Sequence, residues 1–210
     1  MKIVECVQRS TAWMKARAGI PTASEFGRLV TPKWKIRIGE GPRTFLCEKL
    51  AEAITGMPLP QRSVFGALEQ GTILEDEALP WFEFAYSVDV TRVGFCTTDD
   101  GRVGCSPDGL IGDDGGIEIK CPQPQTHVAY LLDGVVPDDY VAQVHGSMFV
   151  TGRPWWQFLS YCRGFPPLLL TVQRDDEIQR TIAQALSLFL KEFDDSIEQI
   201  RKFPTVEPCV

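Results

Sequence analysis

The chain has 210 residues, a length that suits one domain with a sizeable hydrophobic core. Hydrophobic residues make up 44% and charged residues 23% of it, which excludes disordered, collagen-like and coiled-coil classes. No apolar run approaches the roughly 20 residues of a membrane span, and the first residues lack the apolar stretch of a signal peptide. The seven cysteines show no Cys-x-x-Cys spacing, which disfavours a zinc ribbon and fits reduced thiols in a cytoplasmic protein.

The net charge of −7 is distributed unevenly along the chain. Residues 1–49 carry ten Lys or Arg and four Asp or Glu, whereas residues 50–210 carry eleven and twenty-four. This asymmetry indicates a basic approach surface beside a carboxylate-rich remainder, although a solvated helical surface gives the same counts. The acidic total disfavours a protein that coats nucleic acid indiscriminately.

The first quarter of the chain predicts helices around a basic loop. A short helix is expected over residues 10–19, and residues 22–25 match a capping box that starts a second helix. Residues 31–43 combine four basic residues with glycine and proline, which predicts a mobile loop. Hydrophobic spacing over residues 44–54 predicts an amphipathic helix that Gly56 ends.

The rest of the chain predicts a longer helix, then strands, then alternating helices and strands. Residues 65–81 have helical spacing, although Pro80 is expected to kink or shorten that helix. Apolar residues at a period of two, with a hairpin turn at residues 112–116, predict strands over residues 88–96, 102–105 and 117–121. The elements expected after them are a helix at 137–151, strands at 155–162 and 168–173, and a helix at 175–202. This order predicts one α/β domain with a mixed central sheet flanked by helices.

Two acidic residues and one lysine form the candidate catalytic motif of the sequence. Asp108 ends one expected strand beside the hairpin, and Glu118 and Lys120 lie two residues apart on the next strand. Their side chains therefore leave the same face of the sheet, while Ile117 and Ile119 point into the core. Two close carboxylates need a counter-charge, and a hard divalent cation such as Mg²⁺ or Mn²⁺ supplies it. With a lysine to hold or deprotonate a water, the set fits phosphodiester hydrolysis.

Each of these motifs also has a plain structural interpretation. A Glu-x-Lys pair on an exposed strand is commonly a solvated ion pair, but the expected strand–turn–strand context favours a site. A third acid is expected at Glu75, near the packed face of its helix. Residues 75–77 are three consecutive acids, however, which is also typical of an exposed helix face.

The ordered motifs resemble the phage lambda exonuclease and alkaline exonuclease family of the YqaJ type, within the PD-(D/E)XK nuclease superfamily. The core of the resemblance is Ser-Pro-Asp-Gly-Leu at residues 106–110 and Glu-Ile-Lys-Cys-Pro at residues 118–122. Residues 13–25 are similar to the opening motif of the family, residues 71–75 to its helix glutamate motif, and residues 140–148 to its next helix. The resemblance implies a restriction-endonuclease-like α/β fold in one nuclease domain. A helical DNA-end-binding part would occupy residues 1–60, and the catalytic core residues 61–210.

The resemblance also implies a role for each residue that matches a motif. Asp108 and Glu118 would ligate Mg²⁺, or Mn²⁺ in its place, together with the carbonyl of Ile119. Lys120 would orient or activate the attacking water. The other implied residues are Glu75 beside the metals, Gln143 on water or the scissile phosphate, Arg17 and Ser24 on the 5′-terminal phosphate, Leu68 at the terminal base pair, and Arg28, Lys33, Lys35 and Arg37 along the DNA backbone.

The implied activity is a Mg²⁺-dependent exonuclease that degrades one strand of linear duplex DNA from its 5′ end. It would release 5′-mononucleotides and leave 3′ single-stranded tails for recombination. The family implies a homotrimeric ring around DNA and a separate single-strand annealing protein as partner, in the cytoplasm of a bacterial host. Two alternatives stay open: a structure-specific or restriction-type endonuclease of the same fold, and a non-catalytic DNA-end-binding module.

Overall fold

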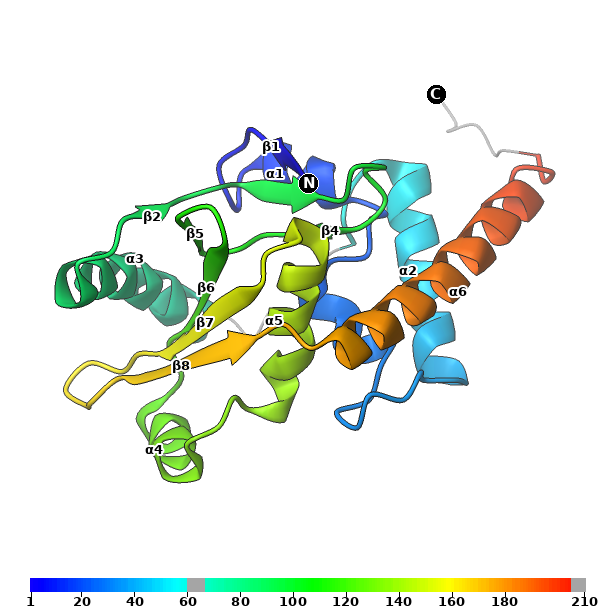
Figure 1. Cartoon of the computed structure of the whole chain (residues 1–210). Helices are drawn as coiled ribbons and strands as arrows, with labels where there is room; N and C mark the ends of the chain where they lie inside the picture. Colours follow the sequence, from blue (N-terminus) through cyan, green and yellow to red (C-terminus); the bar gives the residue numbers. More distant parts are fainter. Residues whose placement is uncertain (60–66, 205–210) are drawn as a thin grey trace.

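The structure is a computed structural model that describes residues 1–59 and 67–204, and of residues 67–73 it describes the backbone alone. A mixed five-stranded sheet with the order β2-β5-β6-β7-β8 forms the centre of the described chain (Figure 1). Its strands are β2 (Val90–Thr91), β5 (Gly109–Ile111), β6 (Gly115–Lys120), β7 (Trp155–Ser160) and β8 (Leu168–Gln173). The predicted mixed sheet flanked by helices is confirmed.

Strands β6 and β7 run parallel, and the other neighbouring pairs are antiparallel. Parallel neighbours need a long crossover, because a hairpin reverses the direction of the chain. Here the helices α4 (Pro124–Asp133) and α5 (Asp138–Thr151) supply it. Helix α4 was not predicted from the sequence, and it begins with Pro124 at a position where a missing N–H group is tolerated.

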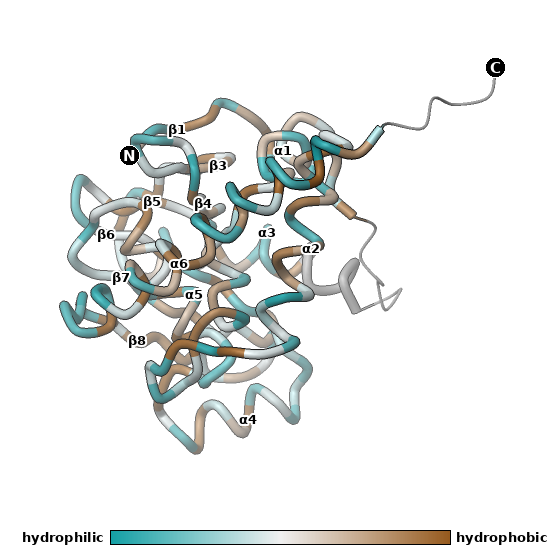
Figure 2. The backbone as a smooth tube through the Cα atoms, turned by 90° about the vertical axis from the view of Figure 1, so that its right-hand side faces the viewer, coloured by the Kyte–Doolittle hydropathy of each residue, from teal (hydrophilic) through white to brown (hydrophobic). Residues whose placement is uncertain are grey.

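A second, smaller sheet has the order β1-β3-β4, with β1 (Lys2–Val4), β3 (Phe95–Thr97) and β4 (Gly104–Cys105). It lies at one end of the molecule, opposite α4 (Figure 2). The single strand predicted over residues 88–96 is therefore wrong, because β2 and β3 belong to different sheets. The chain changes sheets near Gly94, where an added Cβ would lie 1.9 Å from the carbonyl oxygen of Cys6. Only glycine allows the two backbones to approach this closely, because any side chain at residue 94 would clash with Cys6.

The N-terminal helices follow the capping signals. Helix α1 (Thr11–Arg17) begins at the Ser10 side chain, which accepts a hydrogen bond from the Trp13 amide. The predicted second helix is the 3-10 helix η1 (Ala23–Arg28), and Thr22 and Glu25 form its capping box. Helix α2 (Glu40–Thr55) starts four residues before the predicted residue 44 and ends at Gly56. The early start is tolerated because Pro42 lies in the first turn, where an amide N–H has no intrahelical acceptor.

The remaining helices cover both faces of the sheet. Helix α3 (Ala67–Tyr86) continues through Pro80, and α6 (Asp176–Ile200) packs on α2 and α5 (Figure 1). The α5 face of the sheet is filled by the buried residues Leu110, Val144, Met148, Trp156 and Phe158. The α3 face is filled by Ala78, Leu79, Phe82, Ile111, Ile117, Ile119 and Leu159. Among the described residues no helix has the length and apolar character that crossing a bilayer requires.

Candidate active site

Strand β6 has apolar side chains on one face and the two charged side chains of the candidate site on the other. Ile117 and Ile119 pack toward α3, so the side chains between and after them, Glu118 and Lys120, turn to the α5 face. Glu118 is only 2% exposed. An ionised carboxylate at this depth needs charged or hydrogen-bonding partners, because burial strips it of water.

Two partners contact a single oxygen of Glu118. The Lys120 Nζ lies 2.6 Å from Oε1, and the Gln143 Nε2 of α5 donates to the same oxygen at 2.5 Å. The other oxygen, Oε2, is buried and finds no hydrogen-bond partner among the described residues. Because buried polar atoms are nearly always satisfied in native proteins, Oε2 has the character of a ligand oxygen that a cation would complete.

Asp108 directly precedes β5 and does not end a strand as the sequence predicted, and its carboxyl group interacts electrostatically with that of Glu118. Its Oδ2 accepts a hydrogen bond from the Ile119 amide at 2.6 Å, which fixes the carboxyl against β6. Burial raises the pKa of Asp108 well above its ordinary value, and the neighbouring Glu118 raises it further. Burial also raises the pKa of Glu118, against the opposing effect of Lys120. The pair therefore resists carrying two negative charges unless a cation joins it.

Lys120 is held as a cation in this environment. Burial alone would lower its pKa, but Glu118 and Asp108 outweigh burial and raise the pKa above its usual value. The ammonium group also lies 4.9 Å from the centre of the Tyr140 ring, which favours its charged form. A protonated Lys120 can orient a water or a phosphate oxygen through its N–H groups.

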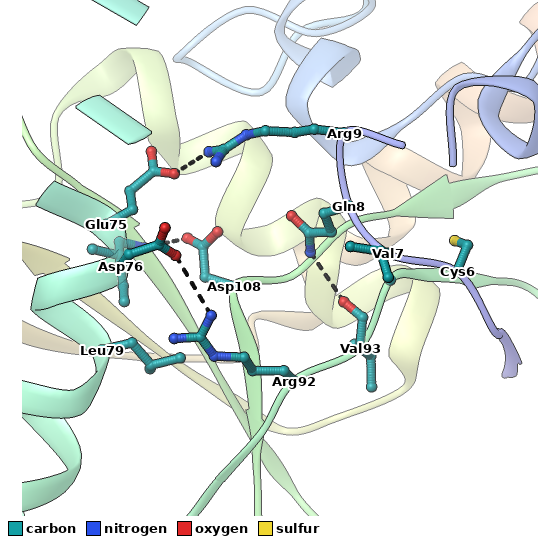
Figure 3. Close-up of a pocket in the computed structure, with 12 residues that line it drawn as sticks. Cys6, Val7, Gln8, Arg9, Glu75, Asp76, Leu79, Arg92, Val93 and Asp108 are labelled. Carbon is teal, nitrogen blue, oxygen red and sulfur yellow. Dashed lines mark hydrogen bonds and ion pairs between the residues drawn. The ribbon is translucent and has the colours of Figure 1, made fainter. Parts of the chain in front are cut away.

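A pocket of about 500 Å³ opens beside Asp108 and Ile119 and reaches α3 (Figure 3). Glu75 lines it, and the three consecutive acids divide their roles. Glu75 pairs with Arg9 and Asp76 lies 3.6 Å from Arg92, whereas Glu77 accepts from Tyr161 and Arg163 outside the pocket. The structure therefore places Glu75 in the pocket that Asp108 lines and not on a fully solvated helix face.

Residues 8 and 9 belong to this pocket but were not predicted from the sequence. The Gln8 Nε2 donates to the carbonyl oxygen of Val93 at 3.0 Å (Figure 3). It also donates to that of Pro107 at 2.8 Å, which anchors the segment beside Asp108. Arg9 has a positive φ of 67°, a conformation that favours glycine. Trp34 and Ser87 share this conformation, so the positive φ by itself does not mark a functional residue, and Arg9 belongs to the site because it lines the pocket and pairs with Glu75.

A second cluster lies two residues before Asp108, at Ser106. The Ser106 Oγ accepts hydrogen bonds from Arg17 Nη1 at 2.9 Å and from Trp13 Nε1 at 2.8 Å. Arg17 also donates to Thr22 Oγ1 at 3.1 Å, and Ser24 Oγ lies 3.3 Å from that hydroxyl. The structure thus brings Arg17 and Ser24 together around Thr22, and it adds Trp13, Thr22 and Ser106 to the cluster. A guanidinium surrounded by hydroxyl groups is a suitable anion site.

The residues expected along the DNA backbone have mixed environments. Arg28 pairs with Glu48 and stacks over the Phe45 ring, and the Arg37 Nε donates to the carbonyls of Gly27 and Val30. These contacts fasten the basic loop, together with a β-bridge between Val30 and Ile36. Lys33 and Lys35 are exposed. The Leu68 side chain lies outside the described residues.

The donor set fits a hard divalent cation. Among the side chains that the structure describes, no group of three or more His, Cys, Asp or Glu forms a ready-made metal cluster. The site offers instead the Glu118 and Asp108 carboxylates, with Ile119 lining the pocket next to Asp108. Mg²⁺ is commonly bound through one or two carboxylates, with waters and substrate phosphates completing its octahedron.

Fold and site together define a mixed α/β protein with the fold of alkaline exonucleases. The crystal structure of the alkaline exonuclease LHK-Exo from Laribacter hongkongensis matches with a TM-score of 0.81 and 29% identity, covering 92% of this chain and 97% of that one. LHK-Exo in complex with dAMP matches with a TM-score of 0.82 and 30% identity over the same shares. A phage-related exonuclease from Haemophilus somnus 129PT, at 13% identity, has a TM-score of 0.67 over 86% of this chain and 96% of that one, which supports the fold alone.

The sequence profile of the YqaJ-like viral recombinase domain matches residues 12–154. The chain belongs to this family. Among curated proteins, none matches the sequence. The matched span includes the two clusters around Asp108, namely the Glu118 and Lys120 group with Gln143 and the Arg17 cluster at Ser106. The Gln8–Arg9 segment of the pocket lies outside the matched span.

Proposed function

We propose that the chain is a Mg²⁺-dependent exonuclease that digests one strand of linear duplex DNA from its 5′ end. It releases 5′-mononucleotides and leaves 3′ single-stranded tails for recombination by strand annealing. The observation that carries the proposal is the buried Glu118 Oε2, which has no hydrogen-bond partner among the described residues, while Lys120 and Gln143 contact the other oxygen and Asp108 is an electrostatic neighbour. Family membership and the alkaline exonuclease fold support the same activity. A homotrimeric ring and a separate annealing protein belong to this proposal.

The residues have separable tasks in such a reaction. Glu118, Asp108 and the Ile119 carbonyl would hold the cation, which when bound would lower the pKa of a water and polarise a phosphoryl oxygen. Lys120 orients the attacking water through its N–H groups, and Gln143 fixes the Glu118 carboxylate. Arg17, with the hydroxyls of Ser106 and Thr22 around it, holds the terminal phosphate.

A time course on linear duplex DNA with distinguishable 5′ and 3′ labels tests the proposal. With Mg²⁺, the 5′ label is expected in mononucleotides while the 3′ label stays in long strands, and a chelator is expected to stop the reaction. Closed circular duplex is the control, because an exonuclease needs an end. Cleavage of the circle would instead indicate an endonuclease, and binding of ends without hydrolysis a non-catalytic module.

The Arg17→Ala variant is expected to lose the preference for a 5′ phosphate. Removing the guanidinium deletes charge-assisted hydrogen bonds, so kcat/KM on phosphorylated ends should fall about 10–100-fold. On 5′-hydroxyl ends the same variant should change little. Initial rates on the two ends at matched salt measure this, and equal rates for the unsubstituted protein would contradict the assignment of a terminal-phosphate site.

A further inference from the structure

A buried ion network lies behind Arg17, centred on helix α2. Lys49 is only 5% exposed, and its Nζ lies 2.8 Å from Glu25 Oε1 and 3.0 Å from Glu52 Oε2. Glu52 is 8% exposed. Buried ion triads contribute little net stability compared with apolar residues of the same volume, because each charge loses its hydration. A contribution to stability therefore does not explain the triad, whereas its location next to the Arg17 cluster suggests a role in that cluster.

One branch of the network leads to the Arg17 side chain. Glu25 Oε2 accepts from the Thr22 amide at 3.1 Å and from the Thr22 hydroxyl at 2.8 Å. Because that hydroxyl donates to Glu25, its oxygen lone pairs are free to accept from Arg17 Nη2, at 3.1 Å. Lys49 thus fixes the position of the Glu25 carboxylate, which in turn fixes the orientation of the Thr22 hydroxyl. That hydroxyl fixes the position of the Arg17 guanidinium.

The other branch leads to the backbone that follows Arg17. Glu52 Oε2, the oxygen nearest Lys49, accepts from the Gly19 amide at 3.1 Å. Gly19 has a positive φ of 74°, and an added Cβ would lie 2.7 Å from the Ala53 Cβ. The chain after α1 is therefore pressed directly onto α2. One branch contacts the Arg17 side chain, the other contacts the backbone two residues after it, and Lys49 pairs with the carboxylates of both branches.

We propose that Lys49 is a positioning residue for the 5′-phosphate site, which it serves through Glu25 and Glu52 without touching DNA. This proposal rests on the proposed function, since it assigns the Arg17 cluster to a terminal phosphate. Electrostatics supports the coupling: burial lowers the pKa of Arg17, and Glu25 and Glu52 both oppose that shift. Without Lys49 the two carboxylates would repel each other, and both Thr22 and Gly19 would lose their fixed acceptors.

The Lys49→Met variant tests the proposal, because methionine keeps the stem and removes the charge. The ratio of kcat/KM on 5′-phosphate ends to that on 5′-hydroxyl ends is expected to fall about tenfold or more, toward the ratio of Arg17→Ala. The loss should appear as a higher KM for phosphorylated ends. Lys49→Arg, which keeps the charge, should recover part of the ratio.

Two further variants separate positioning from stability. Thr22→Val removes the hydroxyl that links Glu25 to Arg17 and that also lies against Ser24, but it leaves the Lys49 ion pairs in place. It should therefore lose the phosphate preference even if Lys49→Met does not fold. Leu186→Ala is the matched control, because Leu186 is buried in the same hydrophobic cluster as Leu46 and Leu50 of α2 but, being apolar, forms no hydrogen bond or ion pair with the network. It should lower the melting temperature and keep the wild-type ratio.

These measurements separate a failure of the proposed terminal-phosphate site from a failure of the positioning role of Lys49. If the unsubstituted protein shows no preference for phosphorylated ends, the terminal-phosphate site fails and the role of Lys49 fails with it. If Arg17→Ala loses the preference while Lys49→Met and Thr22→Val retain it, the terminal-phosphate site stands and the positioning role is overturned. Equal loss of rate on both kinds of end in Lys49→Met would likewise indicate a purely structural residue.

Discussion

Replacing Lys120 with methionine is expected to lower kcat by about 10²–10⁴-fold while binding of DNA ends persists. The ammonium group lies 2.6 Å from Glu118 Oε1 and is the only described lysine nitrogen in contact with that carboxylate. Its removal takes away the group that orients the attacking water and balances the buried charge. Single-turnover hydrolysis of a labelled duplex measures the chemical step, and end binding in the presence of a chelator measures affinity separately.

The Lys191→Met variant is the matched control, because Lys191 is exposed on α6, outside both clusters around Asp108. It should leave hydrolysis and binding unchanged. Since Glu118 loses its ion pair in Lys120→Met, rates are compared well below the melting temperature of each variant. A Lys120→Met variant with near wild-type kcat would remove the lysine from the catalytic set and weaken the nuclease proposal as a whole.

Local patterns predicted most elements of the fold. The apolar spacing over residues 117–121 and the capping box at Thr22 depend on neighbours within one or two turns, and the structure has a strand and a helix start there. The split between β2 and β3 could not be predicted in this way, because it depends on the Cys6 backbone crossing at Gly94. The same is true of strand β1, which pairs with β3 more than 90 residues away.

The candidate site likewise has a part that local sequence patterns predict and a part that only the folded chain brings together. The shared face of Glu118 and Lys120 follows from a period of two, and the structure brings Gln143 of α5 to the same carboxylate. Contacts that close long loops carry no local pattern. The bonds from Arg17 to Ser106 and from Gln8 to Pro107 join residues about 90 to 100 positions apart, so only the folded chain shows them. Lys49 is a similar case, since a lysine on an amphipathic helix is ordinarily a solvent-facing residue.

The Asp108→Asn variant is expected to abolish hydrolysis and yet raise the melting temperature of the metal-free protein. Burial and Glu118 raise the pKa of Asp108 above its ordinary value of 3.8, so the native state keeps a proton that the unfolded chain releases. Between those two pKa values the native state binds more protons, and the free energy of unfolding falls as pH rises. Asparagine removes this penalty and still offers an oxygen to the Ile119 amide. A gain of about 1 kcal/mol at neutral pH would raise Tm by roughly 2–4 °C.

Thermal unfolding with a chelator, at several pH values from 4 to 8, measures the effect. The difference in Tm between Asp108→Asn and the unsubstituted protein should grow as pH rises, because only the aspartate carries the ionisation penalty. Asp113→Asn, in the exposed turn of the β5–β6 hairpin, is the control and should shift neither Tm nor hydrolysis. Added Mg²⁺ should then raise the Tm of the unsubstituted protein and not that of Asp108→Asn, since a bound cation stabilises only a native state that can hold it. If Mg²⁺ stabilised both proteins equally, Asp108 would not be a ligand, and the cation would have to bind elsewhere.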